Sequence, residues 1–212
     1  MFKPIKTKEI GNGLYSIRTL ISNFYILKIE DEYIAFDAGF TSFISRIGLK
    51  KINISPDKIT HVFLTHSDFD HIGALKIFKN AKIYLSKEEE LLVTHKKPRR
   101  GIVFNKKIKK YFTLKNEDVV KIKSLEIKMF LTPGHTIGSA MYAVNNKLLF
   151  VGDSISLKKN NEIKPFSFVQ NMNHNTNKKT IYELKKTNFF NKYEVILTGH
   201  YGIKINYKQT SN

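Results

Sequence analysis

Cysteine and tryptophan are absent from this 212-residue chain, and acidic residues are scarce. The lack of cysteine excludes disulfide bonds, zinc–thiolate sites and cysteine nucleophiles, so any metal ion would need histidine, aspartate or glutamate ligands. No apolar run approaches the roughly 20 residues of a membrane-spanning helix. The lysines near the N-terminus are not followed by an apolar signal-peptide core. The sequence therefore predicts no membrane partner and, by default, a cytoplasmic location.

Basic residues outnumber acidic ones by 36 to 18, which gives a formal net charge of +18. Such a balance favours anionic partners, including phosphorylated metabolites and nucleic acid. The alternative is a lysine-rich, solvated surface that reflects composition alone. The chain has no internal repeat and no linker rich in proline, glycine or serine. Residues 1–212 are therefore predicted to form a single domain.

The pattern of apolar residues predicts a fold that mixes strands and helices. Strand-like runs cover residues 13–18, 23–30, 33–37, 59–64, 81–85 and 195–197, and a further series of strands is expected between residues 113 and 151. Helical spacing covers residues 41–49, 72–78, 86–95 and 176–190. In the first of these helices, Phe43, Ile44 and Ile47 lie on one side. Because the strands come both as hairpins and in β–α–β alternation, the predicted fold class is α/β, a four-layer αββα sandwich of two mixed β-sheets flanked by helices.

Four strand-like runs end in a histidine or an aspartate. Residues 59–64 lead into Thr65-His66-Ser67-Asp68-Phe69-Asp70-His71, and later runs lead into Gly134-His135, Gly152-Asp153 and Gly199-His200. Strands that lie side by side place their ends along a common edge, so these side chains can converge there. Imidazoles and carboxylates are ligands of divalent metals, and one ion needs three or four of them. The pattern predicts a site with two metal ions.

Taken singly, each of these residues has a simpler explanation. A histidine at a strand end is often a surface or capping residue, and Asp70 alone would suit a helix N-cap. His61, His95 and His174 occur without any such context and serve as a comparison within the chain. Capping does not explain three separate apolar strands that end in Gly-His, Gly-Asp and Gly-His beside the first cluster. We therefore favour the metal site.

As a set, these motifs resemble those of the metallo-β-lactamase fold superfamily of metallohydrolases. The resemblance covers nearly the whole chain, from Phe36-Asp37-Ala38-Gly39 through the 65–71 cluster and residues 132–139 to Leu197-Thr198-Gly199-His200. It implies the αββα fold, with the metal ions at the strand edge between the two sheets. It also implies the metal ligands: His66, Asp68 and His135 for the first ion, Asp70, His71 and His200 for the second, and Asp153 as the bridge between them.

Asp68 departs from the commoner family pattern, His-x-His-x-Asp-His. Aspartate is a competent oxygen ligand, but its negative charge shifts the metal preference towards iron or manganese relative to an all-histidine site. Related carboxylate-bearing patterns occur in the family's diiron flavoproteins and in competence-associated nuclease-like members. We expect two divalent ions, with zinc favoured and iron or manganese as the alternatives because of Asp68.

The expected activity is that of a hydrolase. Two cations that share a hydroxide can direct it at a carbonyl carbon or a phosphorus. We expect cleavage of an ester, thioester, lactone or amide bond in a small, anionic substrate. The alternatives are a phosphodiesterase or nuclease acting on nucleotides or nucleic acid, a diiron redox protein, and an inactive metal-binding module.

Three further residues are candidates for roles in this site. Asp70 is a candidate proton acceptor in addition to its ligand role. Tyr201 is a candidate hydrogen-bond donor to an oxyanion, with ring packing under the last strand as the alternative. Asp37 would accept a hydrogen bond from a ligand imidazole, or would simply be a turn residue ahead of Gly39.

Residues 95–110 hold eight lysines and arginines and no acid. One interpretation is a mobile lid that recruits an anionic substrate, with Phe104 and Tyr111 available to stack on a base. The alternative is a solvated basic loop with an apolar anchor at residues 102–104, which the sequence favours slightly. Phe166, Phe168, Met172 and His174 are candidates for the pocket mouth, with core packing as the alternative.

Overall fold

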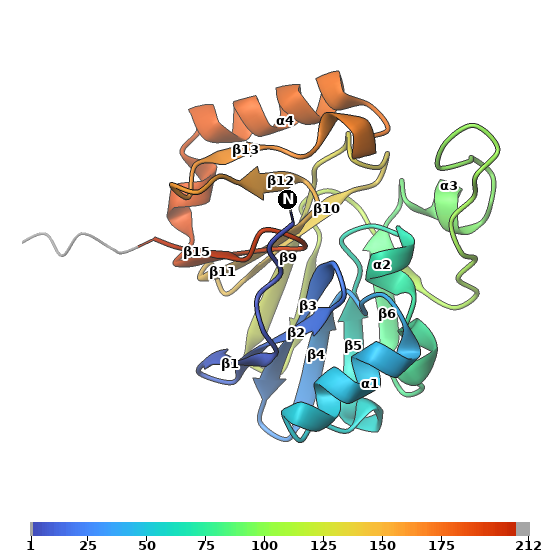
Figure 1. Cartoon of the computed structure of the whole chain (residues 1–212), viewed down its shortest axis with the longest axis vertical. Helices are drawn as coiled ribbons and strands as arrows, with labels where there is room; N and C mark the ends of the chain where they lie inside the picture. Colours follow the sequence, from blue (N-terminus) through green and yellow to red (C-terminus); the bar gives the residue numbers. More distant parts are fainter. Residues whose placement is uncertain (1, 207–212) are drawn as a thin grey trace, which may run out of the picture.

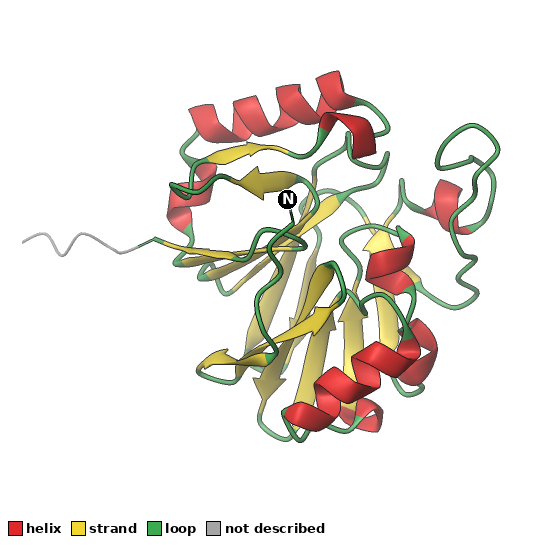
Figure 2. Cartoon of the chain, viewed as in Figure 1, coloured by secondary structure: helices red, strands yellow, loops and turns green. Residues whose placement is uncertain are grey.

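The computed structural model describes residues 2–206 and contains two large β-sheets packed face to face (Figures 1 and 2). The first sheet has the strand order β1-β2-β3-β4-β5-β6-β7. Its strands are β1 (Lys8–Gly11), β2 (Leu14–Thr19), β3 (Ser22–Ile29), β4 (Glu32–Phe36), β5 (Ile59–Phe63), β6 (Lys82–Ser86) and β7 (Phe112–Leu114). Strands β1 to β4 pair antiparallel, and β4 to β7 pair parallel, so this sheet is mixed.

The second sheet has the strand order β15-β14-β11-β10-β9-β8. Its strands are β8 (Val119–Ile122), β9 (Leu125–Leu131), β10 (Ala140–Val144), β11 (Leu148–Gly152), β14 (Val195–Thr198) and β15 (Ile203–Ile205). Strands β11 and β14 are parallel and the other neighbours are antiparallel, so this sheet is also mixed. A separate two-stranded ribbon is formed by β12 (Ile155–Leu157) and β13 (Ile163–Pro165).

Residues 2–206 contain four helices, and the two longest lie on the outer faces of the sheets. They are α1 (Ser42–Lys51), α2 (Phe69–Ile72), α3 (Glu90–Val93) and α4 (His174–Lys186), with single 3-10 turns at Pro56–Lys58, Leu75–Ile77, Phe168–Gln170 and Phe189–Lys192. Figure 1 shows α1 across the first sheet and α4 at the opposite end of the molecule, above the β12–β13 ribbon. No helix within residues 2–206 is long and apolar enough to cross a membrane.

Three separate apolar layers account for this architecture. The middle layer joins the facing sides of the sheets, with Phe36 from β4 and Phe150 from β11 stacked at 3.6 Å between ring centroids. A second layer joins the outer face of the first sheet to α1, and a third joins the outer face of the second sheet to α4. Alternation along β10 assigns Tyr142 to the middle layer and Met141 to the outer one. The predicted αββα sandwich is confirmed.

Helix α1 buries a different face from the one expected. Thr41 caps it by accepting a hydrogen bond from the Ile44 amide at 3.3 Å. The buried residues are Ser45, Gly48 and Leu49, whereas Phe43 is 74% exposed. Small residues let the helix approach the sheet closely, since a Cβ at Gly48 would lie 2.4 Å from Ile17 Cγ2.

Two predicted helices are shorter or placed differently in the structure. The helix expected over 72–78 is instead α2 at Phe69–Ile72 followed by a 3-10 turn. Between the two, Gly73 lies so close to Phe40 that a Cβ would be 1.7 Å from the Phe40 carbonyl oxygen. The helix expected over 86–95 is only α3. Ser86 Oγ accepts from the Glu89 amide at 3.1 Å, but the Glu89 carboxylate does not return to Ser86 as a capping box requires.

Helix α4 begins and ends earlier than expected, at His174 and Lys186 rather than at residues 176 and 190. Asn173 caps it by accepting from the Thr176 amide at 2.9 Å. Asn188 then adopts a left-handed conformation at φ 52°, which ends the helical segment before the 3-10 turn. The short strands β1, β12, β13 and β15 were not expected from the sequence.

The loops that follow β4, β5, β9, β11 and β14 meet at one edge of the two sheets. Backbone hydrogen bonds tie them together across the sandwich: Ala38 N donates to His71 O at 2.7 Å, and Ala140 N donates to Thr65 O at 2.8 Å. Gly199 N donates to Gly152 O at 2.9 Å. This edge is therefore a framework of fixed backbone rather than a set of independent loops.

We expect Phe36→Ala to destabilise the protein by about 3–5 kcal/mol, because it removes a fully buried ring from the layer between the sheets and leaves a cavity. The matched control is Phe43→Ala, whose ring is 74% exposed on α1 and whose effect should stay within about 0.5 kcal/mol. Urea denaturation followed by circular dichroism measures both. Equal stabilities for the two variants would contradict the packing described here.

Candidate metal centre

The seven side chains predicted as metal ligands lie together at the shared edge of the sheets. His66, Asp68, Asp70 and His71 come from the β5–α2 segment, and the remaining three follow β9, β11 and β14. Within the described residues, they form three overlapping groups whose ligand atoms lie within 4.8 Å of one another. The groups are His66–Asp68–His135, Asp70–His71–His200 and His66–His71–Asp153.

Asp153 lies between the His66–Asp68–His135 group and the Asp70–His71–His200 group. Its Oδ2 is 3.0 Å from His200 Nε2, 3.6 Å from His135 Nε2 and 3.9 Å from His66 Nε2. Its Oδ1 is 3.4 Å from His71 Nε2. One carboxylate thus reaches imidazoles of both groups, which is the arrangement that a bridging ligand requires.

The Asp70–His71–His200 group is compact. The Nε2 atoms of the two histidines are 3.4 Å apart. Asp70 Oδ2 lies 3.2 Å from His200 Nε2 and 3.7 Å from His71 Nε2. In the His66–Asp68–His135 group, Asp68 Oδ2 lies 3.1 Å from His135 Nε2 and 3.8 Å from His66 Nε2.

Each of the four imidazoles is oriented through its Nδ1 atom, so that Nε2 points into the cluster. Asp37 Oδ2 lies 2.7 Å from His71 Nδ1, and because a carboxylate only accepts, the imidazole donates. This confirms the prediction that Asp37 accepts a hydrogen bond from a ligand-type imidazole. The partners of the other three Nδ1 atoms are the Ile21 carbonyl, the Thr65 hydroxyl and the Asn171 side chain.

Asp37 is held rigidly for this contact. Its backbone has φ 65°, a left-handed conformation that is uncommon outside glycine. Its Oδ1 accepts from the Thr65 amide at 2.8 Å, and its Oδ2 from the Thr65 hydroxyl at 2.8 Å. The turn therefore fixes a carboxylate behind His71 and joins the ends of β4 and β5.

The charges of the cluster perturb one another strongly. Burial lowers the pKa of His66 well below its ordinary value, and the neighbouring histidines add to this. Burial acts in the same direction on His200, but the Asp153 carboxylate outweighs it and raises the pKa of His200 to about 9. Burial opposes ionisation of Asp153 itself, yet the His200 and His71 charges hold the pKa of Asp153 well below its usual range. Such mutual perturbation is typical of functional sites.

The residues fit a pair of divalent cations. His66 Nε2 and Asp153 Oδ1 are buried in the cluster and have no hydrogen-bond partner, although unpaired polar atoms in protein interiors are costly. Both atoms belong to the donor set that metal ions prefer, and both face the space between the groups. A cation there would satisfy atoms that the protein itself leaves without a partner.

Gly199 makes the close approach of the last loop possible. A Cβ at this position would lie 2.4 Å from Asp153 Oδ1 and 2.7 Å from His71 Cε1. Any side chain here would therefore push into the cluster. This explains the glycine before His200 in the motif of the last strand.

A cavity of about 340 Å³ opens directly over the cluster. Its lining includes Asp68, Asp70, His135, Asp153 and His200. Arg99, Arg100 and Asn105 of the basic segment and Gln170 of the segment before α4 form part of its wall. A small molecule that enters this cavity meets the candidate ligands and two guanidinium groups.

The three histidines used for comparison lie elsewhere in the structure. His61 pairs with the Thr60 hydroxyl at 2.9 Å, and His95 with the Asn105 carbonyl at 2.6 Å. His174 contacts Asn171 at 3.1 Å, so it touches the residue behind His135 without joining the cluster. None of the three belongs to a ligand group in the described part of the chain.

Tyr201 and Phe166 pack beside the cluster. The Tyr201 ring lies edge-on to Phe2 and Phe166, at 5.7 and 5.9 Å between centroids. Phe166 is fully buried and edge-on to His135 at 4.9 Å, whereas Phe168 is exposed. The structure thus shows ring packing for Tyr201, and its role as a donor to an oxyanion stays a prediction.

The apolar anchor expected for the basic segment is wrong. Ile102 is 92% exposed, and Val103 and Phe104 are also exposed. Polar contacts hold this part of the segment: Arg99 pairs with Asp68, and Asn105 Nδ2 donates to Ser67 Oγ at 2.7 Å. The apolar contact of the segment with the core is made by Ile108. The composition of residues 95–110 gave no sign of which arginine would be buried.

Glu89 is a further residue that the sequence did not single out for the site. It is fully buried, and burial raises the pKa of its carboxyl above the ordinary value. Its Oε1 accepts from the Ser67 amide and hydroxyl at 2.7 and 2.5 Å. Its Oε2 accepts from the Thr136 hydroxyl at 2.6 Å and the Gly138 amide at 3.1 Å. Glu89 therefore ties the loop that carries Asp68 to the loop that carries His135.

We expect Glu89→Gln to destabilise the protein by about 1–3 kcal/mol. In either orientation of the glutamine amide, its NH₂ group would face a backbone N–H donor, that of Ser67 or that of Gly138, and the hydrogen bond there would be lost. The control is Glu126→Gln, which alters an exposed ion pair with Lys121 and should cost less than about 0.5 kcal/mol. Thermal unfolding of both variants tests this. An unchanged melting temperature for Glu89→Gln would show that the carboxylate is not needed as a fourfold acceptor.

Comparisons with known proteins agree with this architecture. A sequence model of the metallo-beta-lactamase superfamily matches residues 17–200. A probable metallo-hydrolase of Methanocaldococcus jannaschii is 35% identical over 156 residues, which make up 74% of this chain and 64% of that protein. The solved structure of a subclass B3 metallo-beta-lactamase of Bradyrhizobium japonicum has a TM-score of 0.73 at 18% identity, covering 93% of this chain and 78% of that one.

Two further relatives have names that point to different substrates. A hydroxyacylglutathione hydrolase of Buchnera aphidicola is 28% identical over 148 residues, 67% of this chain and 51% of that protein. A ribonuclease J 2 of Staphylococcus saprophyticus is 26% identical over 139 residues, 60% of this chain and 24% of that protein. The chain thus spans less than two thirds of the length of these curated relatives. The match over residues 17–200 together with the αββα sandwich shows that the chain belongs to the metallo-beta-lactamase superfamily.

Proposed function

We propose that this protein is a dinuclear metal-dependent hydrolase that cleaves an ester, thioester, lactone or amide bond in a small, anionic substrate. The observation that carries the proposal is the position of the Asp153 carboxylate, which reaches imidazoles of both ligand groups. His66, Asp68 and His135 would hold one ion, and Asp70, His71 and His200 the other. Zinc is the metal we favour, with iron or manganese as the alternatives because Asp68 adds a carboxylate.

Two divalent cations held at these positions would supply a water nucleophile of lowered pKa and an electrophilic contact for the bond to be cleaved. The protein itself contributes the orientation of the ligands through Asp37, Thr65 and Asn171. It also places Arg100 in the cavity wall, where the guanidinium donates to the Val169 and Asn171 carbonyls and, among residues 2–206, pairs with no carboxylate. An anionic substrate therefore suits the site electrostatically.

Asp70 is the residue best placed to accept a proton from the reacting groups. Both Asp70 and Asp153 line the cavity, but the Asp70 side chain is partly exposed whereas that of Asp153 is buried. Burial opposes its ionisation, but the His71 charge and a hydrogen bond from His200 lower the pKa of Asp70 below the ordinary value. The carboxylate is thus in the ionised form that a proton acceptor requires, and its position in the cavity, rather than its basicity, supports this role.

One of the relatives and the size of the cavity favour a small acyl substrate. The Buchnera relative is a hydroxyacylglutathione hydrolase, and the match to it covers 67% of this chain. The cavity of about 340 Å³ is within the range of small-molecule sites. These two observations support the acyl bond over larger substrates.

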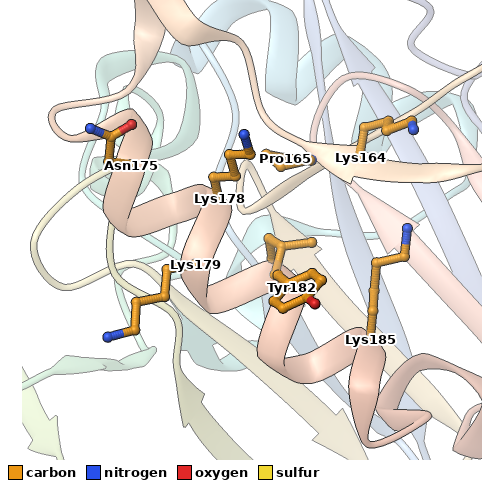
Figure 3. Close-up of a pocket in the computed structure, with 8 residues that line it drawn as sticks. Lys164, Pro165, Asn175, Lys178, Lys179, Tyr182 and Lys185 are labelled. Carbon is orange, nitrogen blue, oxygen red and sulfur yellow. The ribbon is translucent and has the colours of Figure 1, made fainter.

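Phosphodiester hydrolysis is the second candidate. Besides the ribonuclease J relative, a cavity of about 560 Å³ beside α4 favours it, since four of its lining residues are lysines: Lys164, Lys178, Lys179 and Lys185. Figure 3 shows these lysines along α4 and β13, with the Tyr182 ring among them. Clustered lysines near an exposed ring suit the backbone and bases of a nucleic acid. A substrate panel separates the two candidates.

We expect purified protein with its metal to hydrolyse at least one of S-lactoylglutathione, a homoserine lactone and nitrocefin, and to lose this activity on treatment with a chelator. Turnover of bis-p-nitrophenyl phosphate alone would favour the phosphodiesterase. Iron together with oxygen consumption would favour the diiron redox alternative. Stoichiometric metal without turnover of any substrate would favour the inactive binding module.

We expect Asp153→Ala to reduce turnover to the background rate while the fold remains, because the carboxylate between the two groups is lost. The control is Asp31→Ala, which removes a carboxylate that is 91% exposed and belongs to none of the ligand groups among the described residues. This variant should retain activity. Circular dichroism establishes that both variants fold. Full activity of Asp153→Ala would overturn the assignment of this residue.

A further inference from the structure

Arg99 belongs to the basic segment 95–110, but its side chain points away from solvent and lies against Asp68. It is only 7% exposed, although it belongs to a run of otherwise solvated cations. Its Nε donates to Asp68 Oδ1 at 2.7 Å and its Nη2 to Asp68 Oδ2 at 2.8 Å. Nη2 also donates to the Gln170 carbonyl at 2.8 Å. A bidentate guanidinium–carboxylate pair of this kind is both strong and geometrically specific.

The pair places a permanent positive charge beside the His66–Asp68–His135 group. Both Asp68 oxygens accept from the guanidinium, and Asn105 Nδ2 adds a contact to Oδ1 at 3.3 Å. Arg99 Nη2 also lies 3.5 Å from His135 Nε2. The Asp68 carboxylate keeps further lone pairs that a cation could use, but its negative charge is already neutralised by the Arg99 guanidinium. A divalent ion in this group would bind against the repulsion of a fixed neighbour.

The Asp70–His71–His200 group has no such cation. Among residues 2–206, the ion-pair partners of Asp70 are His71 and His200, and no lysine or arginine is one of them. A carboxylate, that of Asp37, stands 2.7 Å behind His71. Negative charge behind an imidazole strengthens it as a ligand.

The hydrogen-bond partners of His66 and His135 carry no charge. His66 Nδ1 contacts the neutral Thr65 hydroxyl at 3.0 Å, and His135 Nδ1 contacts the neutral Asn171 side chain at 3.2 Å. The contrast therefore has two parts: a guanidinium lies against Asp68 in one group, and a carboxylate contacts an imidazole directly in the other. Both parts act in the same direction on the affinity for a divalent ion.

We propose that the two metal positions are unequal: the first ion binds at Asp70, His71 and His200, and Arg99 acts as a tethered counter-cation that keeps His66–Asp68–His135 the weaker position. This inference rests on the dinuclear centre of the proposed function. It assigns Arg99 as a positioning residue for the metal centre. At intermediate metal concentration, the protein holds a single ion.

The experiment is a Zn²⁺ titration of the chelator-stripped 212-residue chain by calorimetry with a competing chelator, checked by elemental analysis. For the unaltered protein we expect two binding steps, the second weaker than the first by at least about tenfold. In Arg99→Met, which keeps much of the side-chain volume without the charge, the second step should tighten by about 10- to 100-fold while the first stays unchanged. Arg99→Lys, which retains the charge, should keep the steps unequal.

Matched variants identify the positions and exclude a general effect of charge. Asp68→Asn should weaken the second step, and Asp70→Asn the first. Arg100→Met removes the neighbouring guanidinium, which donates to the carbonyls of Val169 and Asn171 and, within residues 2–206, to no carboxylate, so both affinities should stay within about twofold. Thermal melting of each stripped variant establishes that it folds.

Two equal steps in the unaltered protein would overturn the inference and leave the dinuclear centre intact. A second step that stays the same or weakens in Arg99→Met would do so as well. If no zinc, iron or manganese binds to the folded protein, the proposed function itself fails. The two failures are therefore distinguishable by the number of ions bound.

Discussion

The carboxylate of Asp153, within 3.9 Å of the Nε2 atoms of four histidines, is the contact on which the organisation of the site depends. Holding it there brings buried charges together, and this is costly unless each has a partner. The structure meets the requirement with fixed groups behind each imidazole and with backbone bonds between the loops, including Gly199 N to Gly152 O at 2.9 Å. Two sheets packed face to face supply the rigid edge from which these loops project.

Support for the site comes from residues outside the cluster. Asp37 joins the ends of β4 and β5 to His71, and Glu89 joins the loops of Asp68 and His135 through four accepted hydrogen bonds. Arg99 adds the third support and differs from the others, because it brings a charge of the same sign as a metal ion. The site is thereby asymmetric in charge, although its two ligand groups look alike in composition.

Much of the fold and the candidate site could be predicted because the signals are local. Strand alternation and the placement of His66, His135 and His200 at strand ends are visible in a few consecutive residues. The errors occur where distant contacts decide the outcome. The segment around Gly73 passes close to Phe40 and forms a short helix and a 3-10 turn in place of the expected helix. Ser45, Gly48 and Leu49 form the buried face of α1, and Ile17 leaves no room for a side chain at Gly48. Glu89 follows Ser86 by three residues, which is the spacing of a capping box, but its carboxylate bonds to Thr136 across the edge of the sheets.

The sequence by itself determined the two-sheet sandwich, the superfamily and the types of side chain gathered at the strand ends, because these follow from periodicity and from motifs within single segments. Only the tertiary structure decided which cation lies against Asp68. Residues 95–110 hold eight basic side chains of similar local context, so no pattern along the chain distinguishes Arg99 from the rest. Its burial depends on Asp68 and the Gln170 carbonyl, 31 and 71 positions away, which come together only when the sheets pack.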